Sequence, residues 1–300
     1  MLNDFKKFVE QNDLGELLEN ESMVHHTYVK TGGRVNFLYT PNSVETLAAA
    51  YKFIHDHSIK YYVIGRGSNL LFTDNPDEMV VIKLSKVIDH LEINGTTVVV
   101  GSGYSLQALS RRVSKLGLSG LEFAGGIPGA MGGSTFMNAG AHNGDLSQVI
   151  TKVTTVTSTG QVKHYTNEQC KFSYRHSIFQ ENDDIIVEIA LELVQDDVAK
   201  VFKRMSGNLE YRKEMQPLDK PSFGSAFRNP VGDHAGRLVE AVGLKGYKIG
   251  GAQVSEKHAN FIINYDLAST KDIIDLIELA KSRVKAETGF DLETEVRIVK

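Results

Sequence analysis

The sequence predicts an α+β protein with two domains. The chain has 300 residues, which is more than one ordinary hydrophobic core accommodates, so two domains are expected. Short candidate strands and scattered helices follow one another without the regular βαβα repeat of a doubly wound fold. A polar stretch at Gln195–Ala199 divides the chain. We therefore expect a first domain at 1–196, built from subdomains of roughly 1–70 and 71–196, and a second domain at 197–300.

Local signals in the first domain predict two helices among short strands. Asn42–Glu45 carries a helix-start signal, and apolar residues at helical spacing continue that helix to His57. A second helix is predicted at Ser105–Leu116 and ends at Gly117. A hairpin is predicted from Val149–Ser158 and Gln161–Tyr165 around the turn Ser158–Gly160. The other predicted strands are Tyr61–Ile64, Val80–Leu84, Thr97–Val100 and Ile185–Val194.

The second domain is predicted to begin and finish with regular elements around a turn-rich middle. Val198–Lys213 has the pattern of a basic helix. A last long helix is expected to start at Ser269 or Thr270, with Gly289 as the residue that ends it. The strand Glu295–Val299 follows that helix.

Composition excludes several classes of protein. A hydrophobic content of 41% and a net charge of −4 describe an ordinary globular chain and argue against a non-specific nucleic-acid binder. Cys170 is the only cysteine, so no intramolecular disulfide is possible, and a buried inert thiol in a reducing compartment is expected. No apolar run approaches a membrane span and no signal peptide is evident, which indicates a cytoplasmic protein without membrane contact. No metal-ligand spacing occurs, and His25 and His26 are expected at the surface.

Ala124–Gly144 carries the strongest functional signal, because seven of its 21 residues are glycine. Backbone without side chains can adopt positive φ or approach a ligand closely, and successive N–H groups form concave sites for anions. A flexible linker is the alternative, but linkers are rich in Gly and Ser without large apolar residues. Ile127, Met131 and Phe136 interrupt this segment. We therefore expect it to be ordered and to hold a phosphate-bearing ligand.

Two shorter glycine turns also follow predicted strands, at Gly65–Asn69 and at Gly101–Leu106. Neither has the third glycine of a Rossmann turn, and the chain has no P-loop motif. Each turn alone is better explained as a structural β-turn. Together they favour a large phosphate-containing cofactor that is held without a Rossmann unit.

Three polar side chains are candidates for chemistry. Arg175 lies in a turn-prone connection, where it is either solvated or functional. Ser225 has only glycine and alanine as neighbours, and because no base is evident nearby we interpret it as a hydroxyl proton donor rather than a nucleophile. Leu292–Val299 alternates like a strand, which places Glu293 and Glu295 on one face. An exposed sheet edge is the alternative interpretation of that face.

Five separated motifs resemble one family in the same order. From about Thr27 to Lys300 the chain resembles the UDP-N-acetylenolpyruvoylglucosamine reductase family, and its first domain also resembles the FAD-binding domain of the vanillyl-alcohol oxidase group. The resemblance implies an α+β fold with a two-part FAD-binding domain of the vanillyl-alcohol oxidase type, followed by a smaller α+β substrate-binding domain. The motifs are VIGRGSNLL, AGGIPGAMGG followed by NAGA, FSYRHS, GSAFRNP and LETEV.

The resemblance implies non-covalently bound FAD, with its pyrophosphate along Gly65–Asn69 and Gly126–Ser134. It further implies that NADPH reduces the flavin and that flavin N5 delivers hydride to the methylene carbon of UDP-N-acetylglucosamine enolpyruvate, which yields UDP-N-acetylmuramate for peptidoglycan. The implied cofactor contacts are Gly65, Arg66, Gly67, Ser68, Asn69, Gly126, Ile127, Gly129, Gly132 and Ser134.

The family match also implies roles for the candidate side chains. Arg175 and Glu295 are expected to stabilise the enolate, and Ser225 is expected to protonate the carbanionic carbon. A carboxylate would repel the enolate, so Glu295 must be protonated or act through water. The expected substrate contacts are Tyr174, Asn229 and Arg212.

Two features depart from the wider family pattern. Only nine residues separate Arg175 from Ile185, which indicates the shorter subtype without a tyrosine-bearing loop. Met215 stands where a lysine is common, so Arg212 or Lys213 would supply the charge for the diphosphate. A monomer is expected. The alternatives are another flavin oxidase of the same FAD-domain group and a non-catalytic nucleotide-sugar binding protein.

Overall fold

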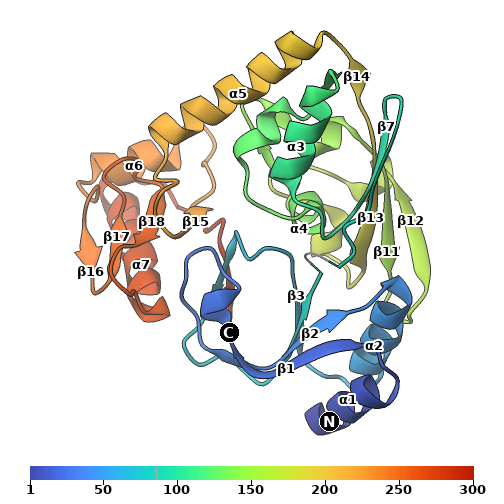
Figure 1. Cartoon of the computed structure of the whole chain (residues 1–300). Coiled ribbons are helices and arrows are strands. Elements are labelled where there is room, and N and C mark those ends of the chain that lie inside the picture. Colours follow the sequence, from blue (N-terminus) through green and yellow to red (C-terminus); the bar gives the residue numbers. More distant parts are fainter. Residues whose placement is uncertain (85–86) are drawn as a thin grey trace. The chain divides into compact units, whose positions relative to one another are not determined.

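The computed structural model describes residues 1–84 and 87–300. The chain divides into two compact units, each of which contains segments far apart in sequence (Figure 1). These units do not coincide with the two predicted domains, and the predicted boundary at residue 196 stays a prediction. Unit 1 comprises Met1–Asn20, Asn36–Arg66 and Glu78–Glu210, and unit 2 comprises Glu21–Val35, Gly67–Asp77 and Tyr211–Lys300.

A five-stranded antiparallel sheet in the order β12-β11-β13-β7-β6 forms one layer of unit 1. Helix α3 (Leu106–Lys115) shares a buried apolar cluster with this sheet through Leu106, Leu109 and Val113, which lie on one helix face. The strands are β6 (Leu91–Asn94), β7 (Thr97–Gly101), β11 (Ile150–Val156), β12 (Val162–Thr166) and β13 (Ile185–Glu192).

A second sheet has the order β1-β2-β5-β3, and β5 pairs in parallel with both β2 and β3. Helices α1 (Leu2–Gln11) and α2 (Val44–Asp56) share its apolar cluster. Helix α2 starts where the sequence predicts because Ser43 and Thr46 form a reciprocal capping box. The strands are β1 (Gly15–Ser22), β2 (Arg34–Pro41), β3 (Tyr61–Ile64) and β5 (Val80–Lys83).

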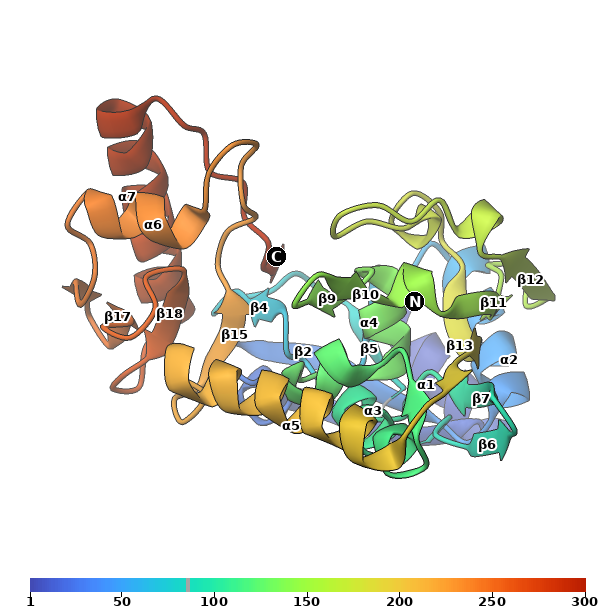
Figure 2. The ribbon, with the colours of Figure 1, turned by 90° about the horizontal axis from the view of Figure 1, so that it is seen from above.

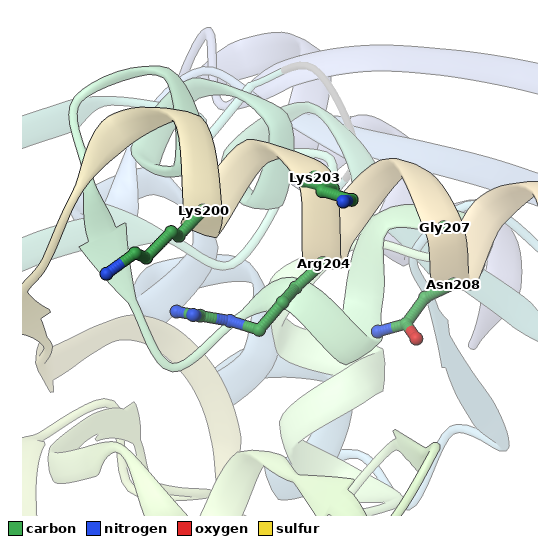
Figure 3. A pocket seen from close by; sticks show the side chains of 5 residues that line it. All are labelled: Lys200, Lys203, Arg204, Gly207 and Asn208. Atoms are coloured by element: carbon green, nitrogen blue, oxygen red, sulfur yellow. The ribbon is translucent and has the colours of Figure 1, made fainter.

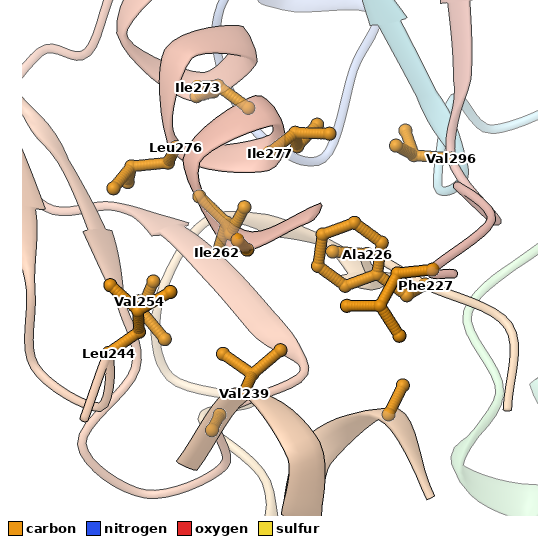
Figure 4. Packing of buried hydrophobic residues seen from close by; sticks show 14 of the residues in the cluster. Ala226, Phe227, Val239, Leu244, Val254, Ile262, Ile273, Leu276, Ile277 and Val296 are labelled. Carbon is orange, nitrogen blue, oxygen red and sulfur yellow. The ribbon is translucent and has the colours of Figure 1, made fainter. Parts of the chain in front are cut away.

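Unit 2 contains a four-stranded antiparallel sheet in the order β15-β18-β17-β16. Figure 4 shows side chains from helix α7 (Thr270–Thr288), from the sheet and from helix α6 (Ala235–Ala241) meeting in its core. A Ser269 capping box starts α7, and Gly289 ends it at a φ of 79°, as predicted. The strands are β15 (Ser222–Ser225), β16 (Lys248–Ile249), β17 (Ala252–Val254) and β18 (Phe261–Asn264).

A short parallel pair joins β19 (Arg297–Val299) to β4 (Leu70–Phe72) within unit 2. The predicted strand Glu295–Val299 and the alternation over Leu292–Val299 are therefore only partly correct. The reason is a change of partner: Thr294 bridges to another segment of the chain, and the ladder with β4 begins only at Arg297.

The remaining predicted elements are confirmed with small shifts at their ends. The hairpin of β11 and β12 is antiparallel, and helix α3 is capped by Ser105. Helix α5 (Val198–Met215) is unbroken over its whole length (Figure 2). The other short elements are η1 (Met23–His25), β8 (Leu118–Ser119), η2 (Glu122–Gly126), α4 (Met131–Phe136), β9 (Gly140–Ala141), β10 (Gly144–Asp145), η3 (Leu146–Gln148), η4 (Glu168–Cys170), η5 (Ile178–Gln180) and β14 (Val194–Gln195).

Candidate active site

The glycine-rich segment Ala124–Gly144 is folded, which excludes the flexible-linker alternative. It contains the end of η2, a turn, helix α4 and the short strand β9. The sequence analysis did not predict α4, because its Gly132 and Gly133 each disfavour a helix by roughly 1 kcal/mol relative to alanine. Tertiary hydrogen bonds compensate: the Met131 N–H donates to the Tyr104 carbonyl at 2.8 Å, and the Gly132 N–H donates to the Ser102 carbonyl at 2.8 Å.

Gly65 at the start of the GRGSN turn and the turn at Gly101–Gly103 both pack against the glycine-rich segment in unit 1. A Cβ on Gly132 would lie 2.8 Å from the Ser102 Cβ, so the 101–103 turn packs directly on α4. A Cβ on Gly65 would lie 2.9 Å from the Ala130 Cβ. These residues must be small because the Cβ atoms of Ser102 and Ala130 already occupy the space beside them. Packing within the protein therefore explains a glycine at position 132, in addition to the cofactor contact that the family match implies.

Gly133 has open space where the other two glycines have protein. It is exposed, and no atom lies within 4 Å of the position that its Cβ would occupy. Backbone without a side chain, next to this open space, allows the close approach of a phosphate-bearing group. Gly126, Gly129 and Ser134 are buried around it and Ile127 is half-buried. The residues present at this turn therefore fit a bound FAD.

The GRGSN turn passes from one unit to the other between Arg66 and Gly67. Gly67 has a φ of 67°, and a Cβ there would lie 1.9 Å from the His26 carbonyl oxygen, so only glycine fits. The side-chain amide of Asn69 forms a hydrogen bond within the protein, in which Nδ2 donates to the Glu295 carbonyl at 3.1 Å. Arg66 and Ser68 are half-buried.

Tyr174 and Arg175 lie at the tip of a tight turn in unit 1. The N–H groups of Ser173 and His176 each donate to the other residue's carbonyl, at 3.1 Å. Arg175 has a φ of 55°, a conformation that costs a non-glycine residue free energy and that clusters at functional sites. Tyr174 is exposed, and its ring centroid lies 5.0 Å from the Arg175 guanidinium carbon.

This turn is fastened to the end of the glycine-rich segment. The Arg175 guanidinium donates to the Gly140 carbonyl at 3.0 Å, and Asn138 Nδ2 donates to the Ser173 carbonyl at 3.0 Å. The Ser177 hydroxyl donates to the Phe136 carbonyl at 2.7 Å. Within unit 1, the structure therefore joins the candidate arginine to the candidate cofactor segment.

Ser225 and Glu295 come together in unit 2. Ser225 is the last residue of β15 and pairs with Phe261 of β18. The next residue, Ala226, accepts a hydrogen bond at 2.8 Å from the Glu295 N–H. Both Ser225 and Glu295 are half-buried. Two candidate residues that are 70 positions apart in sequence thus lie on neighbouring segments.

Comparisons with known proteins decide the family. Residues 216–299 match the domain described as "UDP-N-acetylenolpyruvoylglucosamine reductase, C-terminal domain", and residues 35–166 match "FAD binding domain". The UDP-N-acetylenolpyruvoylglucosamine reductase of Bacillus licheniformis is 46% identical over 288 residues, which cover 96% of this chain and 95% of that protein. The chain belongs to the UDP-N-acetylenolpyruvoylglucosamine reductase family.

Solved structures agree with this family membership and with the predicted fold. The UDP-N-acetylenolpyruvylglucosamine reductase from Thermus caldophilus superimposes with a TM-score of 0.82 at 32% identity, over 95% of this chain and 99% of that one. The glucose dehydrogenase Phl p 4.0202 shares the fold alone, with a TM-score of 0.51 at 17% identity over 65% of this chain and 44% of its own. The predicted α+β class and the FAD-binding domain of the vanillyl-alcohol oxidase type are confirmed. As a member of the reductase family, the chain is an FAD-dependent oxidoreductase.

The predicted substrate contacts also have partners within unit 2. Asn229 is exposed, and its side-chain oxygen accepts from the Ala235 N–H at 3.0 Å, which caps the start of α6. Arg212 on α5 is half-buried, and its Nε donates to Gln216 at 3.0 Å. Met215 and Lys213 are exposed near the end of the same helix.

One polar residue beside Ser225 has no signal in the sequence. Asn260 is 4% exposed, and its amide forms two hydrogen bonds with the backbone of Phe227. A buried asparagine belongs to no catalytic motif and follows no apolar periodicity. Only the tertiary fold shows what it contacts.

A separate open cavity of about 390 Å³ lies along α5 (Figure 3). Arg204 in this lining binds Glu122 and Asp196, each at 2.8 Å. Burial alone would raise the pKa of Glu122, but hydrogen bonds, including those from Gly120 and Arg204, lower it and keep this carboxylate charged. The lining residues are Lys200, Lys203, Arg204, Gly207 and Asn208.

Two predictions about single residues have different outcomes. Cys170 is fully buried, and burial raises the pKa of its thiol to about 12, which confirms an inert thiol. The prediction that His26 lies at the surface is wrong. Only 10% of its side chain is exposed, and its Nε2 lies 2.9 Å from Oε1 of Glu21. His25 is exposed.

Residues 1–84 and 87–300 contain neither a metal-ligand cluster nor a helix suited to a bilayer. No group of three or more histidine, cysteine, aspartate and glutamate side chains among them is placed to hold a metal ion. None of the helices in these ranges has the length and apolar character that a bilayer span requires.

Proposed function

We propose that this protein reduces UDP-N-acetylglucosamine enolpyruvate to UDP-N-acetylmuramate with electrons from NADPH. The supporting observation is that Ser225 and Glu295 lie on hydrogen-bonded neighbouring segments, inside the region that matches the family's own C-terminal domain. A general flavin oxidase would leave this pair without a role. The relatives that match over nearly the whole chain are named for the same reaction.

The cofactor would lie against the glycine-rich turn of unit 1, with Gly133 and its neighbours at the phosphates and Gly65 and Arg66 close by. Bound FAD supplies a hydride acceptor for NADPH and a hydride donor for the enolpyruvyl methylene carbon. We infer that the protein binds it non-covalently, as the resemblance to the reductase family implies.

Arg175 would stabilise the negative charge that develops on the substrate. A guanidinium stays charged and offers two parallel donors to a carboxylate, which a lysine does not. Its restricted backbone and its bond to Gly140 reduce the freedom of the side chain before substrate arrives. Preorganised donors of this kind typically contribute 10²–10³-fold in rate.

Ser225 would give its hydroxyl proton to the carbon next to the carboxylate. Serine is a weak acid, but a carbanionic carbon is a strong base and needs only a positioned donor. Glu295 would act beside it as a protonated acid or through water, since a carboxylate would repel the enolate. Tyr174, Asn229 and Arg212 would contact the UDP-sugar.

We also infer a cytoplasmic monomer that binds no nucleic acid. A single buried cysteine fits a reducing compartment. The net charge of −4 and the acidic pI of about 6.2 fit a protein whose partners are small molecules.

Stopped-flow spectroscopy tests this function. The purified protein should absorb near 450 nm, NADPH should bleach that band, and the enolpyruvyl UDP-sugar should restore it. A protein without flavin absorbance would contradict both enzyme interpretations. Flavin that is reoxidised by oxygen but not by the enolpyruvyl substrate would favour an oxidase of the wider FAD-domain group.

A further inference from the structure

Asn260 holds the backbone that follows Ser225. Its side-chain Nδ2 donates to the Phe227 carbonyl at 2.8 Å, and its Oδ1 accepts from the Phe227 N–H at 3.0 Å. One amide thus pairs with both polar groups of one residue, as a neighbouring strand would. Asn260 and Phe227 are 4% and 1% exposed, so water does not compete for these bonds.

The backbone of Asn260 contributes a third bond to the same segment. Its carbonyl accepts from the Ala226 N–H at 2.7 Å. Ala226 in turn accepts from the Glu295 N–H, and Arg228 donates its N–H to the Glu293 carbonyl at 2.9 Å. The segment held by Asn260 therefore also carries the residues around Glu295.

Asn260 replaces regular strand pairing at the point where that pairing ends. The register between β15 and β18 is irregular between Ser222 and Ser225, and Gly224 has a φ of 83°. Beyond Ser225 the segment leaves β18 and forms only an isolated antiparallel bridge between Phe227 and Thr294. Without the Asn260 amide, the buried N–H and carbonyl of Phe227 would lose these partners, at a cost of roughly 1–3 kcal/mol per group.

We propose that Asn260 is a positioning residue for the protonation step. It acts through Ser225, whose hydroxyl it holds in place by fixing the two residues that follow. This inference rests on the proposed function, in which Ser225 donates the proton. Displacement of a reacting group by about 1 Å can slow a step by the order of 100-fold, so a small shift of this segment has a measurable effect.

The test separates the two half-reactions in Asn260→Ala and Asn260→Asp. Alanine removes both side-chain bonds, whereas aspartate keeps the acceptor for the Phe227 N–H and loses the donor. We expect flavin reduction by NADPH to be unchanged and reoxidation by the enolpyruvyl UDP-sugar to be slowed on the order of 10- to 100-fold. If the alanine variant fails to retain FAD, the aspartate variant decides the question alone.

Asn264→Ala is the matched control. Asn264 lies on β18, is 9% exposed, and pairs with backbone elsewhere in unit 2: its Nδ2 donates to the Val29 carbonyl at 3.0 Å and its Oδ1 accepts from Ala268 at 2.8 Å. It should lose stability much as Asn260→Ala does and yet keep the wild-type reoxidation rate. Equal slowing in both variants would reduce Asn260 to a general structural residue and overturn the proposal.

A double-mutant cycle with Ser225→Ala completes the test. If Asn260 acts through the serine, adding Asn260→Ala to Ser225→Ala gives no further slowing of reoxidation. Additive slowing would overturn the proposal while leaving the proposed function intact. Wild-type reoxidation in Ser225→Ala alone would remove the serine's role, and the positioning role of Asn260 with it.

Discussion

Arg175 and Ser225 are held in two different ways. Arg175 is at the tip of a turn with left-handed backbone, and its guanidinium donates to the Gly140 carbonyl. Ser225 ends a strand, and three hydrogen bonds from Asn260 hold the residues after it. The first arrangement depends on local strain and on the end of α4. The second depends on a sheet and on a buried amide.

This difference indicates which substitutions should displace each side chain. Changes to the glycine-rich segment should reach Arg175, because Phe136, Asn138 and Gly140 fasten its turn. Changes at Asn260 should reach Ser225, because Asn260 immediately precedes Phe261, the β18 residue that pairs with Ser225. The comparison can be tested by variants that act on one arrangement and not on the other.

Ser225→Ala should have the largest effect. Removing the proton donor is expected to slow reoxidation by the enolpyruvyl substrate roughly 10²- to 10⁴-fold, the usual range for a general acid. Flavin reduction by NADPH should stay at the wild-type rate, because that step needs no proton from the serine. Stopped-flow absorbance near 450 nm measures both steps, and equal loss in both would contradict the donor role.

Arg175→Lys should come next. Lysine keeps the charge but loses the planar pair of donors, so we expect roughly 10²–10³-fold slower reoxidation, equivalent to about 3–4 kcal/mol of barrier. The Gly140 bond also loses its guanidinium donor. A lysine variant with wild-type kcat would show that charge alone suffices at this position.

Gly132→Ala and Gly133→Ala form a matched pair on α4, and their effects should differ in kind. The Gly132 Cβ would press on Ser102, which should destabilise the FAD-free protein by roughly 1–3 kcal/mol. The Gly133 Cβ meets no protein atom, so its substitution should leave the thermal midpoint of the FAD-free protein unlowered and weaken FAD binding. Calorimetry and flavin titration measure the two effects. Wild-type FAD affinity in Gly133→Ala would place the cofactor elsewhere.

His258 should give the smallest effect, through pH. Burial lowers the pKa of its imidazole, with nearby Lys245 acting in the same direction and Glu240 opposing. The unfolded chain therefore binds the proton more readily, and the free energy of unfolding should fall as pH drops below the ordinary histidine value of about 6.5. Urea unfolding should show a smaller decrease in His258→Asn. An identical pH dependence in both proteins would exclude His258 as its source.

Strong local signals made much of the fold predictable. Helices α2 and α7 carry their own caps at Ser43 and Ser269, and Gly289 ends α7 by its conformation alone. Helix α4 was missed because consecutive glycines oppose a helix locally, and only its bonds to Ser102 and Tyr104 reveal why it forms. The small sheet of unit 2 was missed as well, because its strands have only two to four residues and β15 pairs with β18, which lies far along the chain.

In the candidate site too, residues with a local sequence signal were predictable and residues defined by tertiary contacts were not. Residue type and motif order were sufficient to select Arg175, Ser225 and Glu295, because each belongs to a distinctive run of the sequence. Whether Asn69 serves the cofactor or the protein could not be read from the sequence, since its contact with Glu295 spans 226 positions. Asn260 could not be found either, because buried amides leave no periodic pattern.

The pairing of β19 with β4 has a consequence for how the protein is made. Asn69 and Glu295, which flank that pair, are 226 residues apart. A ribosome that adds roughly 5–20 residues per second synthesises the second partner on the order of 10–45 s after the first. Throughout that interval Leu70–Phe72 lack the strand they will pair with, and the Glu78–Glu210 segment of unit 1 is translated before that strand. The segments that carry Ser225 and Glu295 are thus among the last to assemble, and the nascent chain lacks this candidate pair until then.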